Sequence, residues 1–158
     1  MSYIRYKNNN LFIENVSVRR LASKFGTPFY LYSESNIIEN YKSFSNNFKK
    51  SKPLICFSVK ANSNIQILKV LKKMGSGADV VSGGELLKAI KSGIQPSKIV
   101  FSGVGKTEEE IKLAIKRNIL LINVESENEA LLINKIAGNL KKKIAIGIRL
   151  NPDINAPT

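Results

Sequence analysis

The chain has 158 residues, 43% of them apolar and 23% charged, which fits one globular domain or part of one. It has no histidine and a single cysteine, so imidazole bases, His-based triads, His-containing zinc sites and internal disulfides are excluded. The sequence shows neither an apolar run long enough to span a membrane nor the apolar core of a signal peptide. We therefore expect a cytoplasmic protein with no membrane partner and no metal site.

The formal net charge is +13, from 25 basic against 12 acidic residues, and such a surplus can indicate a nucleic-acid partner. Lysine accounts for 20 of the 25 basic residues, and with 17 asparagines and 20 isoleucines it makes up more than a third of the chain. This bias runs through the whole sequence, whereas a nucleic-acid-binding surface would be local and richer in arginine. We therefore expect no nucleic-acid partner.

The first part of the chain has no repeating pattern. Residues 11–16 predict a short strand, residues 18–25 a short helix, and residues 29–32 another strand. Residues 36–48 then predict a longer helix, because apolar side chains recur on one helical face: Ile37, Tyr41, Phe44 and Phe48.

From residue 54 onward, short apolar runs alternate with amphipathic segments. The runs lack a clean alternation of apolar and polar residues, which is typical of strands buried on both faces of a parallel sheet. The alternation of strands and helices fits an open doubly wound sheet or a (β/α)8 barrel. A full barrel needs eight strands and roughly 250 residues, so a barrel here would be partial. We predict five strands, at residues 54–59, 78–82, 98–103, 119–124 and 143–150, and four helices, at residues 65–74, 85–91, 108–117 and 127–137.

Three of these helices begin with the pattern Ser/Thr-x-x-Glu, at Ser82, Thr107 and Ser126. This is the pattern of a capping box, in which the hydroxyl accepts a hydrogen bond from the backbone N–H of the Glu, and the Glu carboxylate accepts one from the backbone N–H of the Ser or Thr. We favour capping over a catalytic role for all three hydroxyls.

Polar or small residues follow the predicted strands, and the carboxyl ends of parallel strands form the mouth at which ligands bind. Lys60 directly follows the first apolar run. A lysine there is expected to be poorly solvated, which favours the neutral amine and thus attack on a carbonyl to form a Schiff base. A solvated loop lysine remains the simpler interpretation of the residues alone, because the chain has 20 lysines. Cys56 lies within the same run, and we expect it to be an inert core residue.

The run Phe57-Ser-Val-Lys60-Ala-Asn62 resembles the cofactor-lysine motif of the fold-type III pyridoxal-phosphate decarboxylases, which act on ornithine, arginine or diaminopimelate. Further runs are similar to the diaminopimelate decarboxylases in particular. They occur in order, cover nearly the whole chain, and lie at residues 26–32, 77–86, 101–107, 122–126 and 149–153.

This resemblance implies an alanine racemase-like (β/α)8 TIM barrel, of which about five of the eight strands lie in this sequence. It also implies decarboxylation of an amino-acid substrate, meso-2,6-diaminopimelate, to L-lysine in lysine biosynthesis, with pyridoxal 5'-phosphate as cofactor and a homodimer as the complete enzyme. Lys60 would bind the cofactor covalently and later transfer a proton. Asp79 and Glu85 match acidic positions near that lysine, and Arg149 matches an arginine near the ring oxygen of the cofactor. For Glu85, this match competes with its role in the capping box.

The resemblance further implies that residues 1–34 pack on a C-terminal β domain and that residues 35–158 form a partial cofactor-binding barrel. The family's ring-stacking histidine and glycine-rich phosphate loop match nothing in the sequence, so we expect an N-terminal part of the enzyme. Two other interpretations stay open. One is another fold-type III decarboxylase, acting on ornithine or arginine, and the other is a non-catalytic pyridoxal-phosphate-binding or regulatory protein.

We predict that these 158 residues alone release no CO2 from meso-diaminopimelate when pyridoxal phosphate is added, because the family's histidine and phosphate loop have no counterpart among them. An assay of CO2 release measures this. Turnover at an ordinary enzymatic rate, about 1 s−1 or more, would contradict the prediction.

Overall fold

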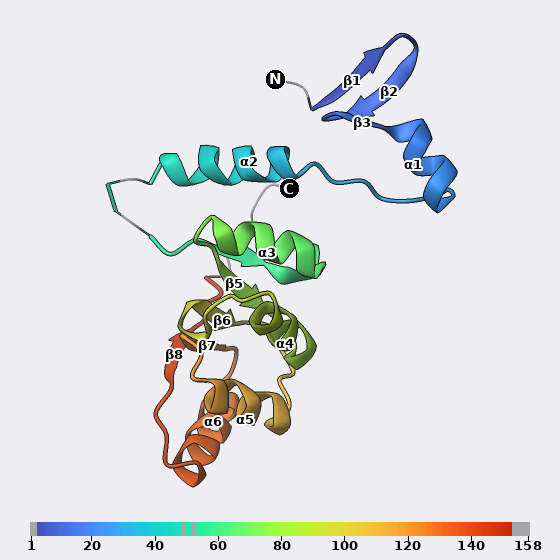
Figure 1. Ribbon diagram of the computed structural model, residues 1–158. Coiled ribbons are helices and arrows are strands. Elements are labelled where there is room, and N and C mark those ends of the chain that lie inside the picture. Colours follow the sequence, from blue (N-terminus) through green and yellow to red (C-terminus); the bar gives the residue numbers. More distant parts are fainter. Residues whose placement is uncertain (1–2, 49, 52, 153–158) are drawn as a thin grey trace. The chain divides into compact units, whose positions relative to one another are not determined.

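The computed structural model describes residues 3–48, 50–51 and 53–152, and Figure 1 traces it from the blue N-terminal part to the red C-terminal part. By its contacts the chain divides into two compact units, residues 1–53 and 54–158. The first holds a three-stranded antiparallel sheet and two helices, and the second holds a five-stranded parallel sheet with its helices. Within the described residues, no helix is long and apolar enough to cross a membrane.

The N-terminal unit begins with an antiparallel sheet of strands β1 (Ile4–Lys7), β2 (Asn10–Ile13) and β3 (Val16–Ser17). Helix α1 (Val18–Phe25) follows directly, and helix α2 (Glu34–Asn46) comes after an extended connection. Both helices were predicted. Helix α2 begins earlier than its apolar pattern, because the hydroxyl of its N-cap residue, Ser33, accepts a hydrogen bond from the N–H of Asn36 at 3.0 Å.

One strand prediction in this unit is confirmed only in part, and another is wrong. The predicted strand 11–16 is split by a turn, in which Glu14 adopts a positive φ of 51° and reverses the chain between β2 and β3. The predicted strand 29–32 is not a strand, and its residue Tyr30 is 90% exposed. Aromatic residues such as those at 29–32 have a high propensity for strands, but a strand also needs a neighbouring strand to pair with.

All five predicted strands of the second unit are present, each shorter than its apolar run. They pair in parallel and in chain order, and they are β4 (Cys56–Ser58), β5 (Gly77–Val80), β6 (Ile99–Phe101), β7 (Leu121–Val124) and β8 (Ala145–Ile148). The four predicted helices are also present, and two short 3-10 turns join them. These elements are η1 (Val59–Ala61), α3 (Ile65–Lys73), α4 (Gly83–Lys91), η2 (Pro96–Lys98), α5 (Glu108–Arg117) and α6 (Glu127–Asn139).

The strand order distinguishes between the two folds that the sequence left open. A doubly wound sheet reverses its order at a switch point and carries helices on both faces. Here the order β4-β5-β6-β7-β8 never reverses, and right-handed crossovers then place every connecting helix on the same face. The unit is therefore part of an α/β barrel.

Strand residues that point toward the helices form the apolar core. Ala78 and Val80 of β5, Phe101 of β6, and Ile122 and Val124 of β7 are buried against the helices. Because successive side chains of a strand point to opposite faces, the residues between them lie on the other face. That face carries polar side chains, including Asp79 and Asn123, and both are half-buried.

Of the three predicted capping boxes, only the one at Thr107 is complete. At Ser82 and Ser126 the hydroxyl accepts the expected hydrogen bond from the Glu N–H, but the Glu carboxylate accepts from the residue before the N-cap. In these two helices the Glu carboxylate therefore accepts from a backbone N–H one residue earlier in the chain than the capping-box pattern predicts.

Glu110 of the complete box also joins two helices. Its Oε2 accepts from the Thr107 N–H at 3.0 Å, and its Oε1 accepts at 2.7 Å from the N–H of Gly83, the first residue of α4. These bonds, that from Gly83 most of all, hold the pKa of the Glu110 carboxyl below its usual range. Because the pKa is lower in the folded state, the stabilisation is complete above the unfolded-state pKa of about 4.3 and is lost as the pH falls through the folded-state pKa.

We predict that Glu110→Gln lowers the free energy of unfolding by about 1 kcal/mol at pH 7, because the neutral amide keeps only one of the two acceptor oxygens. Urea unfolding at a series of pH values measures this. The gap between wild type and variant should close as the wild-type carboxyl becomes protonated below about pH 4.

Glu108→Gln is the matched control on the same helical turn. The Glu108 carboxylate is largely exposed and lies 3.9 Å from Lys112 Nζ, so its removal should cost less than about 0.5 kcal/mol. Equal losses in the two variants would show that general helix electrostatics, and not the bond to Gly83, stabilises this region.

Candidate active site

Lys60 lies in the 3-10 turn η1, directly after strand β4. Its side chain is exposed, and it makes no hydrogen bond or ion pair with any other described residue. The expectation of a poorly solvated lysine is therefore wrong for this chain. Strand β4 ends at Ser58, and the turn that follows buries Val59 completely while it leaves the next residue, Lys60, in solvent.

Asp79 lies on the polar face of β5, the second strand of the sheet. Its Oδ1 accepts a hydrogen bond from the Ser102 hydroxyl at 2.5 Å, and its Oδ2 accepts a longer one from the Ser58 hydroxyl at 3.5 Å. Ser58 is the register partner of Asp79 on β4. The carboxylate is thus oriented by hydroxyl groups that follow or end two neighbouring strands.

Glu85 takes part in the start of helix α4. Its N–H donates to the Ser82 hydroxyl at 3.2 Å, and its Oε2 accepts from the Val81 N–H at 2.9 Å. The local capping role is therefore present, and it occupies one of the two carboxylate oxygens.

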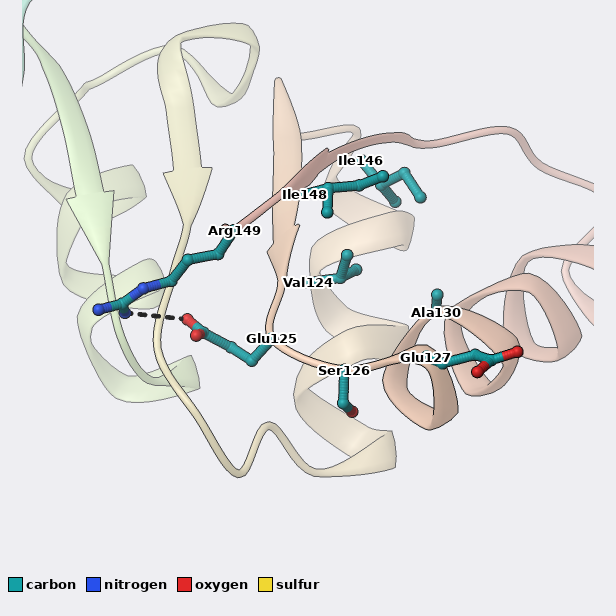
Figure 2. Close-up of a pocket in the computed structure, with 8 residues that line it drawn as sticks. All are labelled: Val124, Glu125, Ser126, Glu127, Ala130, Ile146, Ile148 and Arg149. Carbon is teal, nitrogen blue, oxygen red and sulfur yellow. Dashed lines mark hydrogen bonds and ion pairs between the residues drawn. The ribbon is translucent and has the colours of Figure 1, made fainter. Parts of the chain in front are cut away.

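Arg149 follows strand β8 at the border of a pocket of about 350 Å³, shown in Figure 2. Its guanidinium points across the end of β7 to Glu125, with 3.4 Å between Nη1 and Oε1. The apolar wall of this pocket is formed by Val124, Ala130, Ile146 and Ile148, which lie on the helix-covered side. Asp153, the last residue of the motif that begins at Arg149, lies outside the described residues.

Within the described part of the chain, no hydrogen bond or ion pair joins Lys60, Asp79, Glu85 and Arg149 to one another. A different set of polar residues is joined. The Asn123 side-chain amide donates to the Ser102 hydroxyl at 3.0 Å, and Ser102 donates to Asp79. Their position at strand ends was visible in the sequence, but their pairing depends on the register between strands.

Lys106 is a buried residue that the sequence did not single out. Its side chain is 1% exposed, and its Nζ donates to the Gly103 carbonyl at 2.6 Å, the Asn123 carbonyl at 2.7 Å and Glu129 Oε1 at 3.0 Å. The other Glu129 oxygen accepts from the Glu125 N–H. This ion pair therefore ties the loop after β6 to the end of β7 and the start of α6. Its only signal in the sequence is its place between Gly105 and the N-cap Thr107.

Cys56 begins strand β4 on the polar face and is half-buried, so it is not the core residue that we expected. Its thiol lies 3.8 Å from the Lys98 carbonyl. Burial first, and the charge of Asp79 second, raise the pKa of the Cys56 thiol. A thiol with a raised pKa stays protonated at neutral pH, which makes it a poor nucleophile.

Residues 34–158 match the family model described as pyridoxal-dependent decarboxylase, pyridoxal binding domain. The match covers most of the chain and includes the motif around Lys60. The chain belongs to the pyridoxal-dependent decarboxylase family. This membership confirms the resemblance found in the motifs. The candidate active site of this pyridoxal-dependent decarboxylase domain is the group of polar residues at the carboxyl ends of its parallel strands.

Individual relatives are diaminopimelate decarboxylases. The one from Aquifex aeolicus is 49% identical over 156 residues, which are 99% of this chain and 37% of that protein. The one from Haemophilus influenzae is 44% identical over 158 residues, which are 100% of this chain and 38% of that protein. The chain thus spans little more than a third of the length of the curated relatives that it matches.

Among solved structures, the chain is similar to diaminopimelate decarboxylase from M. jannaschii in co-complex with L-lysine. The TM-score is 0.89 at 40% sequence identity, and the match covers 96% of this chain and 36% of that one. This likeness confirms the predicted fold, a part of the alanine racemase-like α/β barrel.

We predict that Lys106→Met lowers the free energy of unfolding by about 3 kcal/mol, because it removes the buried donor of Glu129 Oε1 and of the Gly103 and Asn123 carbonyls. Denaturant unfolding monitored by circular dichroism measures the loss.

Lys112→Met is the matched control, since Lys112 forms an exposed ion pair with Glu109 at 2.8 Å on the surface of α5. Its loss should cost much less stability than the loss of the buried Lys106 pair, because solvent screens an exposed ion pair. A Lys106 variant as stable as the Lys112 variant would contradict the structural role of the buried pair.

Proposed function

We propose that the chain is the pyridoxal-phosphate-binding part of a diaminopimelate decarboxylase, which converts meso-2,6-diaminopimelate to L-lysine and CO2 in lysine biosynthesis. The observation that supports this most directly is the similarity to two diaminopimelate decarboxylases at 49% and 44% identity along the whole chain. The L-lysine bound to the M. jannaschii enzyme is the product that this reaction would release.

The residues at the strand ends fit pyridoxal phosphate in their chemistry. Lys60 offers an exposed primary amine that pairs with no other described residue, which is the group that an aldehyde needs for covalent attachment. Arg149 offers a cation for an oxygen of the cofactor ring, and Glu125 restrains its direction. When bound, the cofactor accepts the electron pair that the departing carboxylate leaves on the substrate.

Each of the candidate site residues would have a separate role. Lys60 would hold the aldehyde and later move a proton at its Nζ atom. Asp79 would orient the groups around the lysine, because its carboxylate is itself held by two hydroxyls. Glu85 would contribute only its second oxygen, since Val81 already donates to the first.

The substrate proposal follows the similarity of the runs that are typical of diaminopimelate decarboxylases, in preference to ornithine or arginine decarboxylases. A cytoplasmic homodimer, and the packing of residues 1–34 on a further β domain, stay predictions from the family resemblance.

We predict that Lys60 is the lysine that binds the cofactor covalently. After incubation with pyridoxal phosphate and reduction with borohydride, peptide mapping by mass spectrometry should find the largest share of label on Lys60. Lys60→Arg should abolish that peptide's label, whereas Lys69→Arg, which changes an exposed lysine of α3, should leave it unchanged. Label spread evenly over the exposed lysines would contradict the proposal.

A chimera tests the reaction itself. This chain replaces the matching 37% of the Aquifex aeolicus enzyme, and CO2 release is measured with diaminopimelate, ornithine and arginine. We expect release from diaminopimelate alone, and a loss of at least about 100-fold with Lys60→Arg. Release from ornithine or arginine at a similar rate would overturn the substrate proposal.

A further inference from the structure

A row of hydrogen bonds crosses the polar face of the sheet near the carboxyl ends of its strands. It runs from Asn123 on β7 to Ser102 after β6, to Asp79 on β5 and to Ser58 on β4. Four neighbouring strands thus contribute one member each. None of the capping interactions includes Asp79, Ser102 or Asn123, so helix capping does not account for the row.

The direction of these hydrogen bonds is set by chemistry. The Asn123 Nδ2 group can only donate, so the Ser102 oxygen must accept from it. The single proton of the Ser102 hydroxyl is then available for Asp79 Oδ1, which lies 2.5 Å away. Asp79 therefore acts as an acceptor, and its carboxylate is held in one orientation by a hydroxyl whose own orientation is fixed.

Space for this arrangement is left by Gly147 on β8. Gly147 is the register partner of Asn123, and a Cβ atom at this position would overlap Asn123 Oδ1. Any side chain there would push the Asn123 amide away from Ser102. The hydrogen-bonded row therefore also depends on a fifth strand, β8, which must carry a residue without a side chain opposite Asn123.

We infer that Ser102 and Asn123 are positioning residues for the Asp79 carboxylate, and that Gly147 provides the room that they need. This inference rests on the proposed function, in which Asp79 lies beside the cofactor lysine. Ser58 contributes less, because its hydroxyl lies 3.5 Å from the carboxylate, at the limit of a hydrogen bond.

A measurement without cofactor tests the positioning directly. The sequence contains only two aspartates, Asp79 and Asp153, so aspartate labelled with 13C in its carboxyl group gives two signals, and Asp79→Asn assigns them. Ser102→Ala removes the donor to Asp79. Asn123→Asp keeps the size of the side chain but replaces the amide donor with an acceptor that competes for the Ser102 proton.

We expect Ser102→Ala, Asn123→Asp and Gly147→Ala each to move the Asp79 carboxyl signal, and Ser102→Thr, which keeps the hydroxyl, to restore it. Ser58→Ala should move the signal least. Thermal unfolding of each variant shows that the fold is retained. An Asp79 signal that stays in place in Ser102→Ala or in Asn123→Asp would overturn the inference.

The link to the cofactor is tested by the rate of reductive labelling of Lys60 with pyridoxal phosphate. Ser102→Ala and Asn123→Asp should lower this rate about fivefold, the effect of one hydrogen bond, while Ser43→Ala, which changes an exposed serine of α2, leaves it unchanged. A moved Asp79 signal with an unchanged labelling rate would overturn the positioning role. If wild-type Lys60 takes no label, the proposed function fails, and the carboxyl signal alone decides whether Ser102 and Asn123 hold Asp79.

Discussion

Parallel strands in unbroken chain order force every connecting helix onto one face of the sheet, and the position of each polar group follows from this constraint. The helix-covered face must be apolar, and residues such as Val80, Phe101 and Ile122 are completely buried on it. Polar side chains are left with the opposite face and with the carboxyl ends of the strands. The candidate active site is thus located by backbone topology before any particular side chain is considered.

Strands and helices of the second unit were predictable because their signals are local. A β-branched run needs burial wherever it lies, and a hydroxyl three residues before a glutamate can cap a helix whatever surrounds it. The same local logic failed for residues 29–32, since a strand requires a partner that no propensity supplies. It failed for Lys60 as well, because a turn of three residues decides whether Val59 or Lys60 faces the core.

The hydrogen-bonded row could not be predicted for a related reason. Ser102 and Asn123 are separated by 21 positions, and their contact exists only because the crossover through α5 brings β6 and β7 into register. The motif around Lys60 identified the family, since it is contiguous in the chain. Contacts among strand ends are not contiguous, so a single sequence reveals their members but not their pairing.

The overlap between Gly147 and Asn123 has a consequence for how such barrels can diverge. A side chain at position 147 takes up the volume that the Asn123 amide occupies, so the two positions cannot vary independently. In a relative with alanine at 147, an asparagine at 123 would have to turn its amide away or give way to a smaller residue, and either change would alter the donor to the Ser102 oxygen. Sequence change on β8 is in this way coupled, through Asn123 on β7 and Ser102 after β6, to the orientation of Asp79 on β5.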